Sequence, residues 1–352
     1  MNKIAELEII VGTYEEYLLG YKYNPKSKEI KQTFAIHSHS SSIRSVCTSG
    51  NYLASGGADD RIFIYDLKNR KEHCVLTQHN ATVNCIDFTP EHTHVISGSA
   101  DGTLAVVRVG NWQLEKIWEN AHKGSAILDI AVHSSGKLAL TLGSDRTLYT
   151  WNLVKGRQAY IINLNNKSKD PKSLDCVRWA PCGVRFVLAG GKYTEIWSIE
   201  KGGILNAIEH SNKVTCCTWL SNNSLVVGYE NGKLALVNTD NNKVTLCDGH
   251  NSRVKAVVGY EDFIITATSS GDVSIWDKSL NKLSECNSGC RITCLCIATC
   301  ISQDVKKEEI KSEPEDESES ESNDDQKDEE DESDEVEVII PRKKVKTQKT
   351  HR

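Results

Sequence analysis

Residues 79–108 read HNATVNCIDFTPEHTHVISGSADGTLAVVR. Apolar and polar residues alternate from Val83 to Phe88, a short β-prone run follows at 95–98, and a second alternating run covers 104–107. Turn-forming residues separate these runs at 90–93 and at 100–102. The pattern predicts three strands joined by two turns. One such unit cannot bury its own hydrophobic faces, so it needs neighbours of the same kind.

Similar units recur along the chain, each led by a histidine. The leading histidines stand 40, 43, 88 and 40 residues apart, at His39, His79, His122, His210 and His250. The gap of 88 is twice 44, and it contains a degenerate copy without a histidine at 173–198. Because a period of about 40–45 residues with a GH…WD signature is typical of propeller blades, the chain resembles the WD-repeat family. The resemblance implies an all-β, seven-bladed WD40 β-propeller.

The two ends of the repeat region are incomplete blades. Residues 4–36 match the later strands of a blade, and residues 288–300 match only a first strand. We expect both fragments to form one composite blade that closes the ring and removes sheet edges, with six continuous blades over about 37–287. The predicted propeller therefore covers residues 1–301. Eight blades are the less favoured count.

The WD-repeat resemblance also implies a hydrogen-bonded network in each blade, made by the histidine, a turn residue, a strand Ser or Thr and the Trp. The expected pairs are His39 with Asp59, His79 with Asp101, His122 with Asp145, His210 with Asn231, and His250 with Ser270. A His–Asp pair beside a serine also suggests acyl transfer. Recurrence of the pair in at least three blades favours a structural role instead, so we predict no catalytic residue, no metal site and no cofactor.

Composition limits the remaining classes of protein. No apolar run is long enough to span a membrane. Of the thirteen cysteines, Cys85, Cys176, Cys216 and Cys294 align at one strand position, which Ser45, Asp129 and Ala256 fill in other blades. This pattern predicts buried structural thiols in a reducing compartment. A basic connection at 165–172 fits either a solvated loop or a contact for phosphate or an acidic surface.

The repeat can be used to locate a rim of the propeller. The residue before the first apolar position of each inner strand should lie on the His–Asp rim, and these residues are Ser42, Thr82, Ala126, Ser173, Lys213, Arg253 and Arg291. Three consecutive blades thus place a cation at the same height, and scattered surface charge is the alternative. We predict that Lys213, Arg253 and Arg291 form a basic arc that binds RNA phosphate, an acidic peptide or the chain's own acidic segment.

The composition changes abruptly near residue 302. Residues 306–337 contain eighteen Asp or Glu and four Lys, so their net charge is −14, whereas residues 1–305 are close to neutral. We expect 302–337 to be disordered, because almost no apolar residues are available to bury. The basic tail at 338–352 includes a candidate nuclear import signal, Pro341, Arg342, Lys343, Lys344, Val345 and Lys346. Candidate sites for an acidophilic kinase are Ser312, Ser318 and Ser322.

Several stretches go beyond a generic WD repeat. They are EIIVGTYEEYLLGYKY at 8–23, ASGGADDRIFIYDL at 54–67 and HKGSAILDIAVHSSGKLALTLGSDRTLYTWNL at 122–153. With the degenerate fourth blade and the acidic–basic tail, they resemble the PAK-interacting WD-repeat proteins. The resemblance implies a monomeric, nucleolar scaffold that helps to mature the large (60S) ribosomal subunit, through pre-60S proteins or rRNA. It also implies kinase inhibition in signal transduction, by binding the regulatory region of a p21-activated kinase.

Two other functions remain open from the sequence. One is a chromatin adaptor whose acidic tail shields histones. The other is the substrate receptor of a ubiquitin ligase, which is disfavoured because no blade ends in W-D-x-R.

Overall fold

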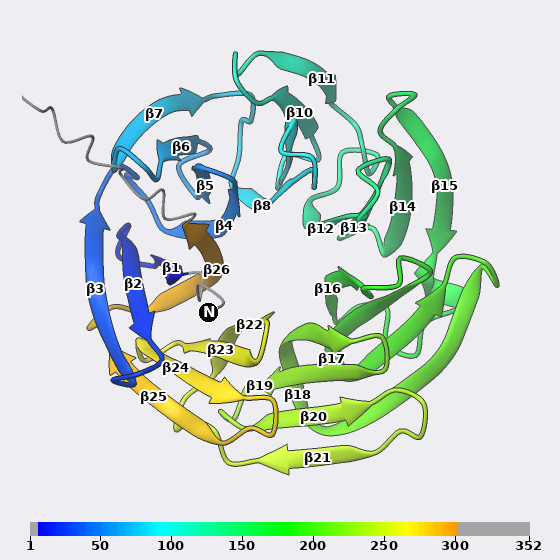
Figure 1. Cartoon of the computed structure of the whole chain (residues 1–352). Coiled ribbons are helices and arrows are strands. Elements are labelled where there is room, and N and C mark those ends of the chain that lie inside the picture. Colours follow the sequence, from blue (N-terminus) through cyan, green and yellow to red (C-terminus); the bar gives the residue numbers. More distant parts are fainter. Residues whose placement is uncertain (1–5, 301–352) are drawn as a thin grey trace, which may run out of the picture. The chain divides into compact units, whose positions relative to one another are not determined.

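The computed structural model describes residues 6–300, which fold almost entirely into β-strands. Sheets of antiparallel strands stand around a central channel like the blades of a propeller (Figure 1). The only helix in this range is the short 3-10 turn η1 (Leu164–Asn166). Within residues 6–300, no helix has the length and apolarity to cross a membrane. The predicted all-β propeller is therefore confirmed.

Five of the sheets contain four strands each. From the channel outward they are β26 (Ile292–Cys300), β1 (Glu6–Thr13), β2 (Leu18–Asn24), β3 (Glu29–Ile36); β4 (Ile43–Ser49), β5 (Tyr52–Gly57), β6 (Ile62–Asp66), β7 (Lys71–Leu76); β8 (Val83–Phe88), β9 (His94–Ser99), β10 (Leu104–Arg108), β11 (Leu114–Trp118); β12 (Ile127–Val132), β13 (Leu138–Gly143), β14 (Thr147–Asn152), β15 (Arg157–Asn163); and β22 (Val254–Tyr260), β23 (Phe263–Thr268), β24 (Asp272–Asp277), β25 (Lys282–Asn287).

The remaining sheet has six strands and corrects the predicted blade count. It comprises β16 (Leu174–Trp179), β17 (Arg185–Ser198), β18 (Gly203–Ser221), β19 (Ser224–Tyr229), β20 (Leu234–Asn238) and β21 (Val244–Cys247). The residues expected to form the fourth and fifth blades lie in this one sheet, so residues 6–300 form six sheets rather than seven. The cause is the pairing of Gly191 with Val214, which carries the hydrogen-bond ladder from β17 into the long strand β18.

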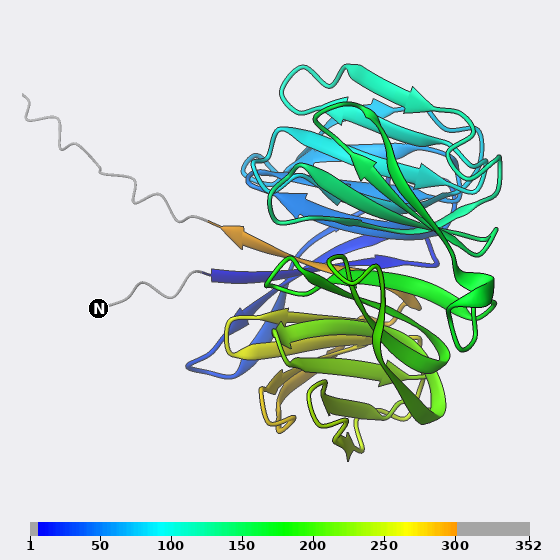
Figure 2. The ribbon, with the colours of Figure 1, turned by 90° about the vertical axis from the view of Figure 1, so that its right-hand side faces the viewer.

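The two ends of the described chain meet in one sheet. Strand β26 pairs with β1 in antiparallel register, from Cys300 opposite Glu6 to Ile292 opposite Thr13. Figure 2 shows the ends of the two strands, β26 in orange and β1 in blue, side by side on one face of the ring. The buried carboxylate of Glu8 on β1 accepts hydrogen bonds from Thr33 (2.6 Å) and from Arg70 of the next sheet (2.9 Å). This ion pair links the closing sheet to its neighbour.

The core lies between the faces of neighbouring sheets. Ile96 and Leu104 of one sheet, for example, pack with Ile127 and Trp151 of the next. Glycines near the ends of four strands let these faces approach closely: Gly12, Gly56, Gly98 and Gly228. A Cβ atom on Gly98 would lie 2.7 Å from Ile127 Cγ2, so a side chain there would force the sheets apart.

Candidate functional site: rim and channel of the ring

The His122 network has all the parts that the repeat predicts. His122 Nδ1 lies 3.1 Å from Asp145 Oδ1, and Nε2 lies 2.7 Å from Thr141 Oγ1. Trp151 Nε1 donates to the same threonine oxygen at 2.8 Å. Because the carboxylate can only accept, the Nδ1 atom carries the proton and Nε2 accepts from the hydroxyl. Buried donors and acceptors are thus mutually satisfied.

The His39 network follows the same scheme. His39 Nδ1 lies 3.0 Å from both carboxylate oxygens of Asp59, and Nε2 lies 2.8 Å from Ser55 Oγ. The pairing of His39 with Asp59 agrees with the expected pattern. Asp59 also accepts from the backbone N–H of Ser40, so it fixes the loop that carries the histidine.

The structure corrects the three other expected pairs. His79 Nδ1 contacts Thr103 Oγ1 at 2.5 Å, and Asp101 instead accepts from the backbone N–H groups of Asn80 and Thr103. Thr103 therefore lies between the predicted partners, because its position two residues after the turn Asp brings its hydroxyl closer to the imidazole.

The partners predicted for the last two histidines are wrong. His210 contacts Tyr229 OH and Thr194 Oγ1, each at 2.8 Å, rather than Asn231. His250 Nδ1 lies 3.8 Å from Glu285 Oε1, rather than near Ser270. The side chain of Ser270 is short and donates to Asp272 at 2.6 Å, so Glu285 on the outer strand is the nearer acid.

Burial keeps these imidazoles neutral. It lowers the pKa of His39, His79 and His122, with Asp59 and Asp145 partly opposing the effect on their partners. It lowers the pKa of His210 and His250 to about 4. Both ring nitrogens of His39, His79, His122 and His210 have side-chain hydrogen-bond partners inside the sheets, so these groups hold the fold together.

A buried glutamate that the sequence analysis missed anchors the basic connection at 165–172. Glu195 is fully buried on β17, and it accepts from Ser168 Oγ at 2.8 Å and from the backbone N–H of Lys169 at 2.6 Å. It also accepts from Trp197 Nε1 at 3.2 Å. The glutamate thus bonds the Trp, as Thr141 does in the His122 network, and a loop N–H, as Asp59 does in the His39 network. The lysines of this loop, Lys167, Lys169 and Lys172, are exposed.

The rim positions predicted from the repeat are structurally equivalent in six of the seven cases. In each, the carbonyl oxygen of the rim residue accepts a backbone hydrogen bond of 2.8 or 2.9 Å from a turn residue, and these rim residues are Ser42, Thr82, Ala126, Lys213, Arg253 and Arg291. No such bond is found for Ser173 among the described residues. The three predicted cations therefore occupy matching places before neighbouring inner strands.

The three cations differ in their surroundings. Lys213 and Arg291 are exposed, and the Arg291 guanidinium lies 5.3 Å from the ring centre of Tyr14. Arg253 forms an ion pair with Glu230. The predicted basic arc, defined by Lys213, Arg253 and Arg291, is therefore partly neutralised on β22.

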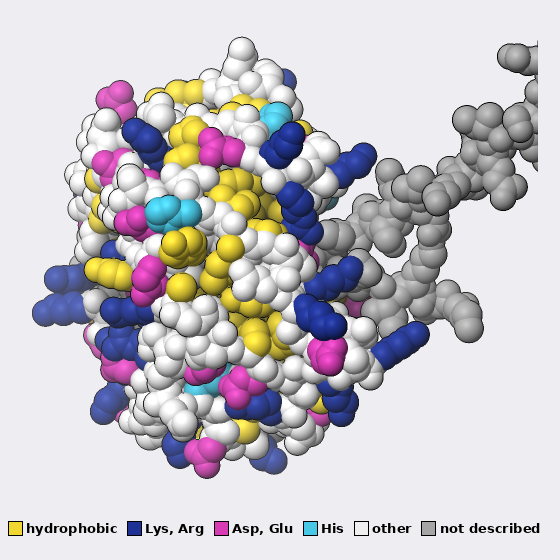
Figure 3. Space-filling model, turned by 90° about the vertical axis from the view of Figure 1, so that its left-hand side faces the viewer, with side chains coloured by type: hydrophobic (Ala, Val, Ile, Leu, Met, Phe, Trp, Pro, Cys, Tyr) yellow, Lys and Arg dark blue, Asp and Glu magenta, His cyan; other side chains and the backbone are white. Residues whose placement is uncertain are grey.

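Elsewhere, on the outer face beside β3, cations and acids are mixed around a band of hydrophobic side chains (Figure 3).

A β-bulge recurs near the start of every inner strand and turns one side chain toward the channel. The pairing register shifts at this point in β4, β8, β12, β16, β18, β22 and β26. The residues at these bulges all line a cavity of about 590 Å³ in the channel, and we call them the bulge ring: Arg44, Asn84, Leu128, Asp175, Thr215, Lys255 and Thr293. Sequence periodicity gave no sign of this ring.

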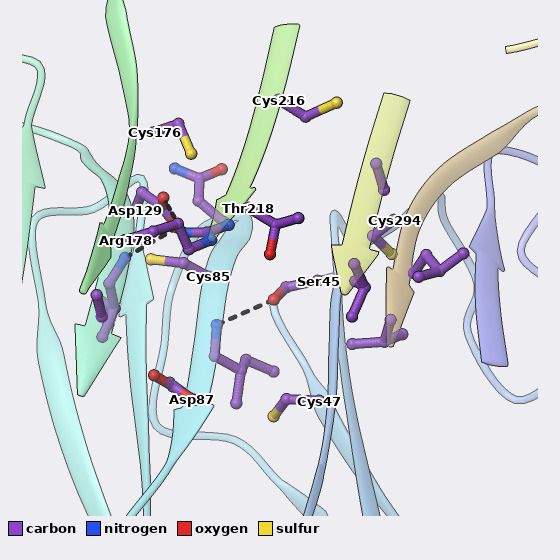
Figure 4. A pocket seen from close by; sticks show the side chains of 18 of the residues that line it. Ser45, Cys47, Cys85, Asp87, Asp129, Cys176, Arg178, Cys216, Thr218 and Cys294 are labelled. Atoms are coloured by element: carbon purple, nitrogen blue, oxygen red, sulfur yellow. Dashed lines mark hydrogen bonds and ion pairs between the residues drawn. The ribbon is translucent and has the colours of Figure 1, made fainter. Parts of the chain in front are cut away.

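Carboxylates gather on one wall of the channel. Asp129 and Arg178 form an ion pair, and Figure 4 shows these two side chains facing one another. Asp129 also accepts from the backbone N–H of Val177 at 2.8 Å. Burial raises the pKa of Asp87 to about 6, and burial together with the charge of Asp129 raises that of Asp175 to about 7.

The aligned cysteines lie on the same inner strands. Cys85, Cys176 and Cys216 are buried, Cys294 is half-buried, and burial raises the pKa of Cys216 to about 12. The thiols are therefore protonated at neutral pH. Among the described residues, no group of three or more His, Cys, Asp or Glu has the arrangement of a metal site.

Several predicted features lie outside the described residues. They are the acidic segment 302–337, the candidate phosphorylation sites Ser312, Ser318 and Ser322, and the basic segment 338–352 with its import signal, 341–346.

Comparison with known proteins identifies the family. The model of the WD domain, G-beta repeat, matches residues 29–66, 70–107 and 113–152. A p21-activated protein kinase-interacting protein 1-like from Danio rerio is 31% identical over 300 residues, which cover 82% of this chain and 79% of that protein. The Shk1 kinase-binding protein 15 of Schizosaccharomyces pombe is 30% identical over 293 residues, 82% of this chain and 83% of its own length. The chain belongs to the family of p21-activated protein kinase-interacting proteins.

Family membership agrees with the resemblance seen in the sequence. A more distant relative, Protein MAK11 of Saccharomyces cerevisiae, is 26% identical over 198 residues, 49% of this chain and 47% of that protein. Each WD unit matched in the chain contains the outer strand of one sheet and the first three strands of the next, as in residues 29–66, which hold β3 to β6. This stagger ties neighbouring sheets together covalently.

Proposed function

We infer that the protein is a non-catalytic WD-repeat scaffold that acts as an assembly factor for the large (60S) ribosomal subunit and restrains a p21-activated kinase. The scaffold role is supported by the repeated contacts between histidines and hydroxyl groups. They are buried inside the sheets and hold the strands together, while the rim and channel present charged side chains, of which Arg44, Lys213 and Lys255 form no ion pair among residues 6–300. Charged groups without partners in the fold are suited to binding other molecules, which supports the scaffold role.

The kinase role is supported by the relatives' names. Those in zebrafish and fission yeast are named for interacting with or binding a kinase, and they align with this chain over most of its length. We propose the same for this chain, with the regulatory region of the kinase as its target. Capture of the purified regulatory region on immobilised protein would test it. We expect binding that inhibits phosphorylation of a substrate by the intact kinase. Binding without inhibition of the kinase would contradict the restraining role.

The ribosomal role follows from the family resemblance and from the basic arc, whose cations suit rRNA phosphate or acidic ribosomal proteins. Sedimentation of the tagged protein on a gradient, followed by mass spectrometry, tests it directly. Co-migration with pre-60S particles is expected.

The second candidate, an adaptor for histones, is favoured by the charge of −14 on residues 306–337. Co-migration with histones instead of pre-60S particles would establish that function.

We further propose that the protein acts in the nucleus and nucleolus, carried there by an import receptor that binds 341–346. Replacing Arg342, Lys343, Lys344 and Lys346 with Ala should move a fluorescent fusion out of the nucleus, because an acidic receptor groove reads a compact cationic run. A fusion that stays nuclear would show that another signal is used.

A further inference from the structure

The bulge ring contains two kinds of residue. Asn84, Thr215 and Thr293 each donate a hydrogen bond to the carbonyl oxygen of the first residue of the next inner strand, at 2.8, 2.6 and 2.6 Å. These three side chains therefore join neighbouring strands around the channel.

The charged members of the ring make no such bond. Among residues 6–300, neither Arg44 nor Lys255 forms a side-chain hydrogen bond or an ion pair, although both line the cavity. Arg44 is exposed to the channel, and Lys255 is half-buried. Positions that hold the fold together on β8, β18 and β26 thus carry free cations on β4 and β22. Charged side chains without a structural partner in a cavity are candidates for ligand binding.

The cations are gathered on one side. Strand β26 lies between β22 and β4, so Arg44 and Lys255 flank the same strand. Burial and the nearby charges of Arg253, Arg291 and Arg44 lower the pKa of Lys255. A bound anion would relieve this repulsion. The exposed rim cation Arg291 extends the cationic side outward from the ring, whereas Arg253 is paired with Glu230.

The opposite side is acidic. Asp175 belongs to β16, which lies across the channel from β26 (Figure 1), and Asp129 is next to it on β12. Only Asp129 has an ion-pair partner there among the described residues, in Arg178. Asp175 forms no ion pair among residues 6–300, and burial with the charge of Asp129 raises its pKa to about 7, although Lys213 and Arg178 oppose that shift. The ring is thus dipolar, with cations on β4 and β22 and a carboxylate on β16.

We propose that the bulge ring binds an extended, acid-rich peptide segment of a partner protein, whose acidic side chains meet Arg44 and Lys255 and whose Lys or Arg meets Asp175. A cavity of about 590 Å³ accommodates a few side chains of such a segment. An RNA strand matches the site less well, because its uniform negative charge would also face Asp175 and Asp129. This site does not depend on the ribosomal role proposed above.

Fluorescence anisotropy with the purified full-length protein at low salt tests the proposal. The probes are a labelled peptide of glutamates with a central lysine, an all-glutamate peptide and an oligouridylate. Arg44→Gln and Lys255→Gln should each weaken binding of the mixed peptide about tenfold, as expected for the loss of one favourable charge contact of about 1.4 kcal/mol. Asp175→Asn should weaken the mixed peptide and strengthen the all-glutamate peptide.

Two controls separate binding from folding and from net charge. Thr141→Val removes buried hydrogen bonds to His122 and Trp151 outside the ring, so it should lower the thermal midpoint yet leave peptide affinity nearly unchanged. Lys71→Gln removes an exposed cation from the outer strand β7 and should change neither quantity. The proposal is overturned if Lys71→Gln weakens the peptide as much as Lys255→Gln does, or if oligouridylate binds as tightly as the mixed peptide and is lost with the same variants. Because purified components are used, neither result bears on pre-60S association.

Discussion

Thr141→Val is the substitution that isolates the internal network most cleanly. Valine has nearly the shape of threonine, so the change removes a hydroxyl without opening a large cavity. That hydroxyl is the partner of both His122 Nε2, at 2.7 Å, and Trp151 Nε1, at 2.8 Å. His122 is fully buried and Trp151 is 2% exposed, so water cannot replace the lost bonds. Each unsatisfied buried group costs about 1–3 kcal/mol, so for the two groups we expect a loss of about 2–6 kcal/mol in the free energy of unfolding.

The assay is urea denaturation of the full-length protein, followed by tryptophan fluorescence, with the midpoint and the slope m compared between variants. Thr150→Val is the matched control, because Thr150 lies on the neighbouring strand β14, is half-buried and makes no side-chain hydrogen bond among the described contacts. Its cost should be within about 0.5 kcal/mol. Equal midpoints for the two variants, at an unchanged m, would refute the claim that the histidine networks stabilise the sheets.

Three further predictions concern packing, pH and the tail. Gly98→Val should cost about 1–3 kcal/mol, because its side chain would strike Ile127, whereas Gly203→Ala, in open space, should be nearly neutral by urea midpoint; equal costs would contradict the close approach of the sheets. His250 has a folded pKa of about 4, so the unfolded chain takes up its proton first as pH falls from 6.5, and stability that depends on the neutral imidazole is lost between pH 6.5 and 4. The free energy of unfolding that is lost between pH 7 and pH 5 should therefore be about 2 kcal/mol smaller in His250→Gln than in the native protein, and identical losses would contradict the assignment. Asp87 and Asp175 have raised pKa values that act in the opposite sense, but they are present in both proteins and so do not affect the difference. Truncation after Ile301 should leave the urea midpoint unchanged, and a lower midpoint would show that later residues contribute to the core.

Sequence alone predicted the parts of the fold that local patterns determine. The repeat period and the incomplete end fragments were enough to expect a ring closed by β26 and β1, which do pair. The contacts of His39 with Asp59 and of His122 with Asp145 are those that the resemblance to WD repeats implied.

Features that depend on register or on competing partners could not be predicted. The sheet formed by β16 to β21 depends on one pairing, Gly191 with Val214. Gly191 has a φ of 56°, and the sequence around it did not predict this backbone conformation. Thr103 takes the contact with His79 that was expected for Asp101, and the spacing D-x-T did not reveal it, because in the same spacing Asp145 still contacts His122. The bulge ring was missed because a bulge shifts the facing of one residue without changing the apolar alternation around it.

The central claim is that the propeller is a docking scaffold for a pre-ribosomal particle. Charge reversal in the basic arc tests this claim most directly. Lys213→Glu, Arg253→Glu and Arg291→Glu are combined in the tagged full-length protein, and its sedimentation is compared with that of the native protein. The account predicts that the triple variant leaves the pre-60S fractions while its thermal unfolding stays nearly unchanged, since the hydrogen bonds that align these residues involve their backbone carbonyl oxygens. A folded triple variant that still sediments with pre-60S particles like the native protein would contradict it.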